Sequence, residues 1–188
     1  PSYADNFLKQ EIAQAKTLAG DDILTEGAKI YTTLDTTAQQ NLYNIVNTGN
    51  YITYPDDTMQ VASTVTDVKT GAVIAQIGGR NQPSNVTFGF NQAVQTDRDW
   101  GSTMKPIVDY GPAFENNIYT STNNYVSDSP TTYPNGTPLK NWDNTYFGSM
   151  TVKSALALSR NIPAVKTLIN VGLDNSSKFV NGLGITLD

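Results

Sequence analysis

The sequence predicts an α/β fold of the α+β type, in which helices flank an antiparallel sheet that this chain does not complete. Residues 61–67 alternate and are β-branched, residues 68–71 read as a tight turn, and residues 72–77 read as a second strand, which together predict a β-hairpin. No closing strand follows the later helices, so we expect the sheet to be unfinished within this sequence. Apolar spacing, caps and proline positions predict five helices, at residues 3–16, 36–46, 101–114, 152–158 and 163–172.

The segments between these elements carry their own signals. Residues 29–34 form a short β-rich run, which predicts a strand. Asp35 then caps the following helix through its side chain. Pro106 lies in the first turn of the helix at 101–114, where its missing N–H costs nothing. Residues 116–148 are rich in turn-forming residues and read as a long loop, a kind of segment that is usually functional inside a domain.

We expect a domain boundary near residue 60. The chain has 188 residues, which suits one domain or a small module followed by part of another. Residues 1–60 combine helix, strand and helix in a short length and look like an interdomain linker region. Residues 61–188 begin a domain of sheet and helices that looks unfinished.

The composition excludes several classes of protein. The net charge is −5 and the basic residues are scattered, which argues against nucleic acid as a partner. The chain has no His and no Cys, which excludes Ser-His-Asp triads, thiol catalysis, disulfides and thiolate metal sites. No acidic cluster suggests a metal, and we expect neither a metal ion nor a cofactor. A catalytic serine in this chain would need Lys, Asp, Glu or Tyr as its base.

The strongest candidate for chemistry is Ser102, with Lys105 as its base. Side chains three residues apart lie on one face of a helix, within reach of each other. At a helix N-terminus the free N–H groups and the dipole favour developing negative charge. A lysine can take the serine proton if burial lowers its pKa from about 10.4. The spacing alone is a weak signal, which Gly101 before it and Pro106 after it strengthen.

A second candidate group is the tripeptide Ser159-Arg160-Asn161. The hydroxyl of Ser159 could relay a proton, and the amide of Asn161 could hold a peptide-like substrate because it both donates and accepts. The same residues also fit a helix end followed by an Asn in the left-handed region. A competing copy at residues 121–123 lies in the polar loop and is more typical of a turn.

Three other patterns carry less weight. The tripeptide Lys69-Thr70-Gly71 matches a third element of serine acyl enzymes, but it precedes the other two and fits the hairpin turn. Trp142 could wall a substrate cleft, although loop aromatics more often pack on their own domain. Residues 97–99 read as a solvated turn beside the site.

The order of these motifs resembles the transpeptidase domain of penicillin-binding proteins. The resemblance is carried by residues 101–106, Gly-Ser-Thr-Met-Lys-Pro, and by residues 154–164, which contain Ser-Arg-Asn. Residues 64–79 look like the first hairpin of that fold. Residues 31–39 look like the segment between the glycosyltransferase and transpeptidase domains of the bifunctional, class A members. The resemblance implies a serine β-lactamase/transpeptidase-like fold, with residues 61–188 as the N-terminal part of the domain.

The resemblance also implies a reaction. Ser102 would attack the D-Ala–D-Ala bond of a peptidoglycan stem peptide and pass the acyl group to an amine on a second strand. Lys105 would be the base, Ser159 would relay the proton, and Asn161 would hold the substrate. β-Lactam antibiotics would acylate Ser102 as mimics of that peptide. The implied location is the outer face of the bacterial cytoplasmic membrane, through an N-terminal anchor that this sequence lacks.

Parts of the family pattern are missing from this sequence. A later Lys-Thr-Gly motif and the glycosyltransferase domain are absent, so we expect the isolated chain to be inactive. The C-terminal remainder of the domain would be its partner, either in the same polypeptide or in a separate chain after nicking. A β-lactamase or D,D-carboxypeptidase on the same scaffold is an alternative, which the linker-like N-terminal region argues against. A non-catalytic β-lactam-sensing domain is another.

Overall fold

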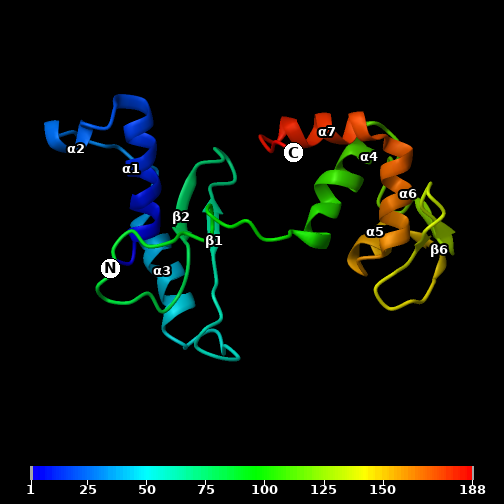
Figure 1. Cartoon of the computed structure of the whole chain (residues 1–188), viewed down its shortest axis with the longest axis horizontal. Helices are drawn as coiled ribbons and strands as arrows, with labels where there is room; N and C mark the ends of the chain where they lie inside the picture. The colour runs from blue at the N-terminus through cyan, green and yellow to red at the C-terminus, as the bar shows by residue number, and fades with distance from the viewer. Residues whose placement is uncertain (1, 188) are drawn as a thin grey trace. The chain divides into compact units, whose positions relative to one another are not determined.

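A computed structural model describes residues 2–187, and the chain forms two compact units (Figure 1). Unit 1 is Pro1–Arg98 and unit 2 is Asp99–Asp188. The boundary expected near residue 60 falls inside unit 1, and the assignment of residues 1–60 to an interdomain linker stays a prediction. None of the helices within residues 2–187 combines the length and apolar character that a membrane crossing requires.

Unit 1 contains three helices and the predicted hairpin. Its elements are α1 (Asp5–Ala19), α2 (Ile23–Glu26), α3 (Thr36–Asn47), β1 (Ser63–Thr66) and β2 (Val73–Ile77). The two strands pair antiparallel, with Ser63 opposite Ile77, which confirms the hairpin. The predicted cap of α3 is also confirmed, because the Asp35 carboxylate accepts from the N–H of Ala38 at 2.9 Å.

A buried glutamine ties the helices of unit 1 to the hairpin. The side chain of Gln39 donates to the carbonyl of Gln76 at 2.9 Å and accepts from its N–H at 2.8 Å. The same amide donates to the carbonyl of Tyr3. Residues 29–34 do not form the predicted strand. They run extended beside β2, where only isolated bonds form, such as the one from the Thr33 hydroxyl to the carbonyl of Val73.

The tripeptide Lys69-Thr70-Gly71 lies in the hairpin turn, as predicted. The carboxylate of Asp67 accepts from the N–H groups of Lys69 and Thr70 at 2.9 and 2.8 Å. These bonds, that from the Thr70 N–H above all, hold the pKa of Asp67 below its usual range. Gly71 has φ +72°, which explains the glycine at this position. The tripeptide is therefore structural within unit 1.

Unit 2 contains four short strands and a series of helices. The strands are β3 (Tyr125–Asp128), β4 (Thr131–Thr132), β5 (Pro138–Leu139) and β6 (Gly148–Thr151). β3 pairs with β6 and β4 with β5, both antiparallel. The expectation of a structureless loop at 116–148 is therefore wrong in part. β4 and β5 are too short to show a period, and the partner of β3 is β6, on the far side of both in the sequence.

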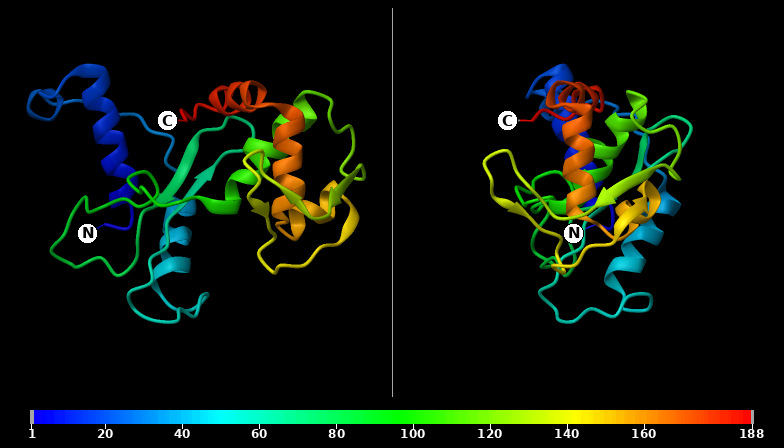
Figure 2. Two further views of the ribbon diagram at one scale, coloured as in Figure 1. Left: turned by 45° about the vertical axis from the view of Figure 1, so that its right-hand side comes forward. Right: turned by 90° about the vertical axis from the view of Figure 1, so that its right-hand side faces the viewer.

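The helices that follow the strands are α5 (Val152–Ala157), α6 (Asn161–Val171) and α7 (Leu173–Gly182). The first two were predicted, although α6 begins two residues before Pro163. Helix α7 was not predicted from the sequence. The chain turns sharply between α6 and α7 (Figures 1 and 2), where Gly172 has φ +85°.

Residues 101–115 are helical throughout, as predicted, but change their winding twice. They form a 3₁₀ helix η1 (Gly101–Met104), a π turn η2 (Pro106–Tyr110) and α4 (Gly111–Glu115). Because Pro106 has no N–H, the carbonyl of Ser102 accepts from Lys105, three residues on. The N–H of Gly111 reaches back five residues to the carbonyl of Pro106.

The second proline of this segment is compensated by α7. Pro112 cannot donate to the carbonyl of Val108, and the hydroxyl of Ser176 donates to it instead at 2.6 Å. The π turn and α7 pack closely, so that a Cβ on Gly111 would lie 2.7 Å from the ring of Phe179. The apolar core beside them is formed by Tyr110, Ala113, Tyr119, Val152, Ala164 and Val171.

The close packing at Gly111 leads to a stability prediction. Gly111→Ala should destabilise the chain by about 1–3 kcal/mol, because the added methyl meets Phe179 and the carbonyl of Pro106. Gly182→Ala in α7 is the matched control, since a Cβ there meets nothing within 4 Å. We expect the control to be neutral or up to about 1 kcal/mol more stable. Thermal unfolding measures both, and equal melting temperatures for the two variants would contradict this packing.

Candidate active site

Lys105 is the point at which three of the predicted site residues meet. Its Nζ donates to the carbonyl oxygen of Ser159 at 2.8 Å, to the hydroxyl of the same residue at 3.0 Å, and to Oδ1 of Asn161 at 2.8 Å. The side chain of Lys105 is buried, and those of Ser159 and Asn161 are half-buried. Ser159 and Asn161, which follow Lys105 by 54 and 56 positions in the sequence, therefore both contact its ammonium group.

Ser102 occupies the exposed end of the same helical segment. It lies in the 3₁₀ helix η1, and its backbone carbonyl accepts from the N–H of Lys105. In a 3₁₀ helix, side chains three residues apart eclipse one another, so this winding aligns Ser102 with Lys105 more closely than an α-helix would. No hydrogen bond joins their two side chains among the described residues.

The turn that leads into Ser102 depends on two residues before it. Gly101 has φ +52°, a conformation that side chains with a Cβ rarely adopt. The carboxylate of Asp99 accepts from the N–H of Gly101 at 2.8 Å. The interpretation of residues 97–99 as a solvated turn was therefore incomplete, because Asp99 is exposed but fixes the start of η1.

Ser159 has an unusual backbone conformation, with φ +52°. It follows α5 at the position where a helix end most often has glycine. Its N–H donates to the carbonyl of Leu156, and the next N–H, from Arg160, donates to the carbonyl of Ala155. The alternative that placed Asn161 in the left-handed region is therefore wrong. Ser159 holds it, and Asn161 begins α6. The left-handed turn lets both the carbonyl and the hydroxyl of Ser159 face Lys105.

Asn141 fixes the start of α6 from outside that helix. Its Oδ1 accepts from the N–H groups of Asn161 and Ile162 at 2.9 and 3.2 Å. The side-chain Nδ2 of Asn161 donates to the carbonyl of Lys140 at 3.1 Å. This contact orients the amide so that its oxygen faces Lys105.

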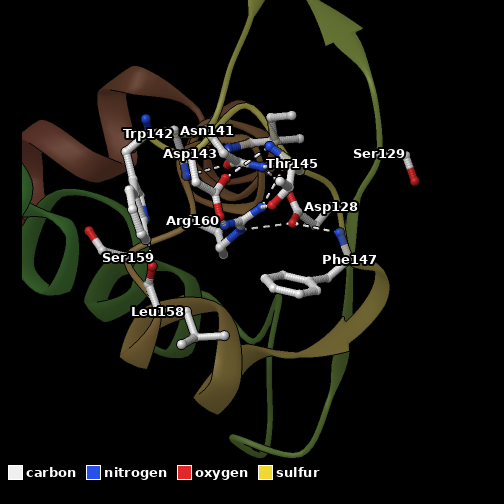
Figure 3. A network of polar contacts seen from close by, with 12 residues as sticks. Asp128, Ser129, Asn141, Trp142, Asp143, Thr145, Phe147, Leu158, Ser159 and Arg160 are labelled. Atoms are coloured by element: carbon white, nitrogen blue, oxygen red, sulfur yellow. Dashed lines mark hydrogen bonds and ion pairs between the residues drawn. The ribbon is translucent and has the colours of Figure 1, made fainter.

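Arg160 lies between the two residues that contact Lys105 and is almost completely buried. Its guanidinium donates to Asp128 at 2.9 Å, to Asp143 at 2.7 Å and to the carbonyl of Thr145 at 2.6 Å (Figure 3). It also stacks on the ring of Phe147, 4.5 Å from the centroid.

No role for Arg160 was predicted from the sequence, and neither were its partners. One available signal was a cation in the short connection between the apolar helices α5 and α6, where burial would require acidic partners.

The charges around Lys105 act in opposite directions. Burial lowers the pKa of its ammonium from the usual 10.5, Asp109 raises it, and the Arg160 guanidinium lowers it. Burial also raises the pKa of Asp109 to about 6, against the opposing effect of Lys105. The pKa of Asp143 is held at about 2, mainly by its hydrogen bond from Arg160.

Trp142 and the competing Ser-x-Asn copy have different surroundings. Trp142 is 70% exposed, and its indole N–H donates to the carbonyl of Leu158 at 3.2 Å, directly before Ser159 (Figure 3). The hydroxyl of Ser121 accepts from the N–H of Asn123 at 3.1 Å. Residues 121–123 therefore form the predicted turn, whereas the ring of Trp142 stands exposed beside the Ser159 turn.

Comparison with known proteins identifies the family. Residues 61–187 match the penicillin-binding protein transpeptidase domain. The chain belongs to this family. As a penicillin-binding transpeptidase sequence it is 56% identical over 186 residues to penicillin-binding protein 1A of Streptococcus oralis, and 55% identical to that of Streptococcus pneumoniae (strain ATCC BAA-255 / R6). Each match covers 98% of this chain, but 29% and 26% of the respective relative. The resemblance to class A penicillin-binding proteins is confirmed.

Solved structures agree on the fold. The penicillin-binding protein PonA1 from Mycobacterium tuberculosis matches 97% of this transpeptidase chain with a TM-score of 0.76 at 23% identity, over 45% of its own length. The PonA1 protein in complex with penicillin V matches 98% with the same TM-score, at 22% identity and over 48% of its length. The predicted transpeptidase-like α+β fold is confirmed.

The raised pKa of Asp109 leads to a pH prediction. Between its unfolded pKa of 3.8 and its folded pKa of about 6, the folded state binds more protons than the unfolded state. Stability should therefore fall as pH rises from about 4 to 6, by up to about 3 kcal/mol from this group.

Asp109→Asn should remove this contribution, which urea unfolding at pH 4 and pH 7 measures. Asp174→Asn, at an exposed position of α7, is the control and should keep the parental pH dependence. An Asp109→Asn profile parallel to the parent would contradict the assignment.

Proposed function

We propose that this chain supplies the nucleophile side of a peptidoglycan D,D-transpeptidase site that β-lactams acylate. The observation that carries the proposal is the convergence of Ser159 and Asn161 on Lys105, the residue aligned with Ser102 in η1. The nucleophile and the amine thus come from one helical segment, and the second hydroxyl and the amide come from the connection between α5 and α6 and from the start of α6. The family to which the chain belongs supports the reaction class.

The proposed reaction has two acyl transfers. Neutral Lys105 takes the proton of Ser102 as its Oγ attacks the carbonyl of a D-Ala–D-Ala bond. The C–N bond breaks, the terminal D-Ala leaves with the proton as a free amine, and an ester remains on Ser102. An amine of a second stem peptide then attacks the ester carbonyl. Lys105 takes a proton from that amine and passes it to Oγ of Ser102, which leaves as the free hydroxyl. A β-lactam would form the same ester, because its ring amide replaces the D-Ala–D-Ala bond.

Ser159 is suited to relay the proton. Of the three oxygens that face Lys105 Nζ, the carbonyl of Ser159 and Oδ1 of Asn161 only accept hydrogen bonds. The Ser159 hydroxyl can accept from an ammonium or donate to a neutral amine. It is thus the group whose bond to Lys105 reverses when the lysine changes charge.

Asn161 and Trp142 are the proposed substrate contacts. The amide nitrogen of Asn161 uses one N–H on the carbonyl of Lys140, which leaves the other to donate to a peptide carbonyl. The exposed ring of Trp142 beside Ser159 would form one wall of the peptide groove.

The rest of the proposal concerns the longer protein. We propose that this chain is a segment of a bifunctional class A enzyme at the outer face of the bacterial cytoplasmic membrane. The later Lys-Thr-Gly motif, the glycosyltransferase domain and the anchor would lie outside the chain, which would be inactive when isolated. If the remainder of the domain is a separate chain after nicking, a denaturing gel of the protein from its source shows two polypeptides. A single band at the mass of this chain would exclude a separate partner chain.

Two alternatives share the same serine. A β-lactamase or D,D-carboxypeptidase would also form an ester on Ser102 but would hydrolyse it quickly. A β-lactam sensor would form the ester without a peptide reaction. The similarity to penicillin-binding protein 1A over 98% of the chain, including its linker-like N-terminal region, favours the transpeptidase.

The identity of the nucleophile can be tested by trapping. In the longer protein that contains this chain, labelled penicillin should form a stable adduct that mass spectrometry places on Ser102. Ser102→Ala should abolish the adduct, because alanine has no hydroxyl to attack the β-lactam carbonyl. Ser121→Ala, in the competing motif, is the matched control and should label normally. Unchanged labelling of Ser102→Ala would rule out the catalytic assignment.

The role of Lys105 can be tested through pH. The acylation rate should rise with pH as Lys105 loses its proton, with a midpoint below its usual pKa of 10.5 because burial lowers the pKa. Lys105→Met should acylate at least about 100-fold more slowly and show no such rise. A parental profile that is flat, or a Lys105→Met variant with parental rates, would exclude the lysine as the base.

A further inference from the structure

We propose that Arg160 is a positioning residue, whose buried guanidinium holds Ser159 and Asn161 at Lys105. The proposal rests on the function proposed above and deepens it. Among the described residues Arg160 makes no hydrogen bond to Lys105, and its own side chain is buried. It would act through the two residues on either side of it.

The first argument is how completely the Arg160 side chain is fixed. A guanidinium carries its donors in a rigid planar fork. Here Nε, Nη1 and Nη2 each have an acceptor within 2.9 Å, from Asp128, Asp143 and Thr145 respectively. Phe147 lies against its face. Contacts on three edges and one face define the plane of the group, and therefore the place of the backbone from which it extends.

The second argument is that the same network also reaches Asn161 by another route. Asp128 is fully buried and accepts from Arg160 through Oδ2 and from Asn141 through Oδ1, at 2.9 and 2.6 Å. Asn141 in turn accepts from the N–H of Asn161. One carboxylate thus orients both the arginine before Asn161 and the cap of the helix that Asn161 begins.

The third argument concerns the left-handed turn at Ser159. This conformation is unfavourable for a residue with a Cβ and persists where the surroundings enforce it. The backbone of Arg160 closes the turn through its bond to the carbonyl of Ala155, and its side chain is anchored on the β3 strand and the 143–145 segment. The anchored arginine therefore keeps both oxygens of Ser159 directed at Lys105.

The location of the Arg160 network indicates a role in the site in addition to fold stability. Buried ion pairs are often no more stabilising than apolar side chains of similar size, because desolvation offsets their attraction. Stability alone therefore gives little reason for a charged group at this place. Its position between the two residues that contact the proposed base gives a specific one.

The experiment compares rate and stoichiometry of penicillin labelling in the longer protein. Arg160→Lys keeps the charge but loses the fork, and Asp143→Asn removes one partner while the pair with Asp128 remains. Matched controls are Arg98→Lys and Asp174→Asn, which change exposed residues of the same types. A stopped time course gives the acylation rate constant, and its end point gives the folded, competent fraction.

We expect Arg160→Lys to acylate at least tenfold more slowly and Asp143→Asn about threefold more slowly. Both should still reach one label per folded molecule, and the controls should match the parent. A purely structural role would lower the end point and leave the rate constant unchanged. If Arg160→Lys does not fold, the rate constant of Asp143→Asn decides. Rate constants within twofold of the parent in every folded variant overturn the proposal.

A crystal structure of a folded variant separates this proposal from the proposed function. In Arg160→Lys, or in Asp143→Asn if only that variant folds, we expect Ser159 to leave the left-handed region or its hydroxyl to move beyond 3.5 Å from Lys105 Nζ. If Ser159 keeps both its left-handed conformation and its hydroxyl contact with Lys105 Nζ, the positioning role is overturned, even if Ser102 is acylated. If the contacts are lost in the variant but the parent is never labelled on Ser102, the proposed function fails. The role of Arg160 in holding Ser159 at Lys105 then still stands.

Discussion

The ion pair between Arg160 and Asp128 is the contact on which the candidate site depends. Both side chains are buried, so each would be costly alone, and removing one partner of such a pair typically destabilises a protein by about 3–5 kcal/mol. The structure satisfies the pair from all sides, with Asp143, Thr145 and Asn141 completing the hydrogen bonds. Strand β3, the 141–145 segment and the start of α6 are thereby joined within one unit.

The nucleophile side of the site follows from a different constraint, the two prolines of residues 101–115. Pro106 has no N–H to donate to the carbonyl of Ser102, so the N–H of Lys105 donates to it instead and the first turn is a 3₁₀ helix. The chain then widens into a π turn, and α7 supplies the donor that Pro112 lacks. Local windings of this kind recur at functional sites, where they re-aim side chains. Here the tight turn aligns Ser102 with Lys105.

The local parts of this architecture could be predicted from the sequence, and the distant parts could not. The hairpin, the cap at Asp35 and the spacing of Ser102 and Lys105 depend on neighbours in the chain. The Arg160 network joins residues 15–32 positions apart, which no spacing reveals. The alternative interpretation of residues 159–161 placed Asn161 in the left-handed region, because Asn tolerates it, whereas the bonds that close the α5 turn place Ser159 there. Residues 29–34 do not form the expected strand, because they make isolated hydrogen bonds to β2 and not a continuous ladder.

Lys105 lies between the ends of two helices, which act on its charge in opposite directions. The carbonyl of Ser159 follows the C-terminus of α5, where a cation is stabilised, whereas Asn161 begins α6, whose N-terminus disfavours one. Burial disfavours the ammonium and lowers the pKa of Lys105, Asp109 raises that pKa, and Arg160 lowers it. Had α5 continued as a right-handed helix, the carbonyl of Ser159 would bond along the helix and be lost to Lys105. The left-handed turn therefore converts a helix end into an acceptor for the proposed base.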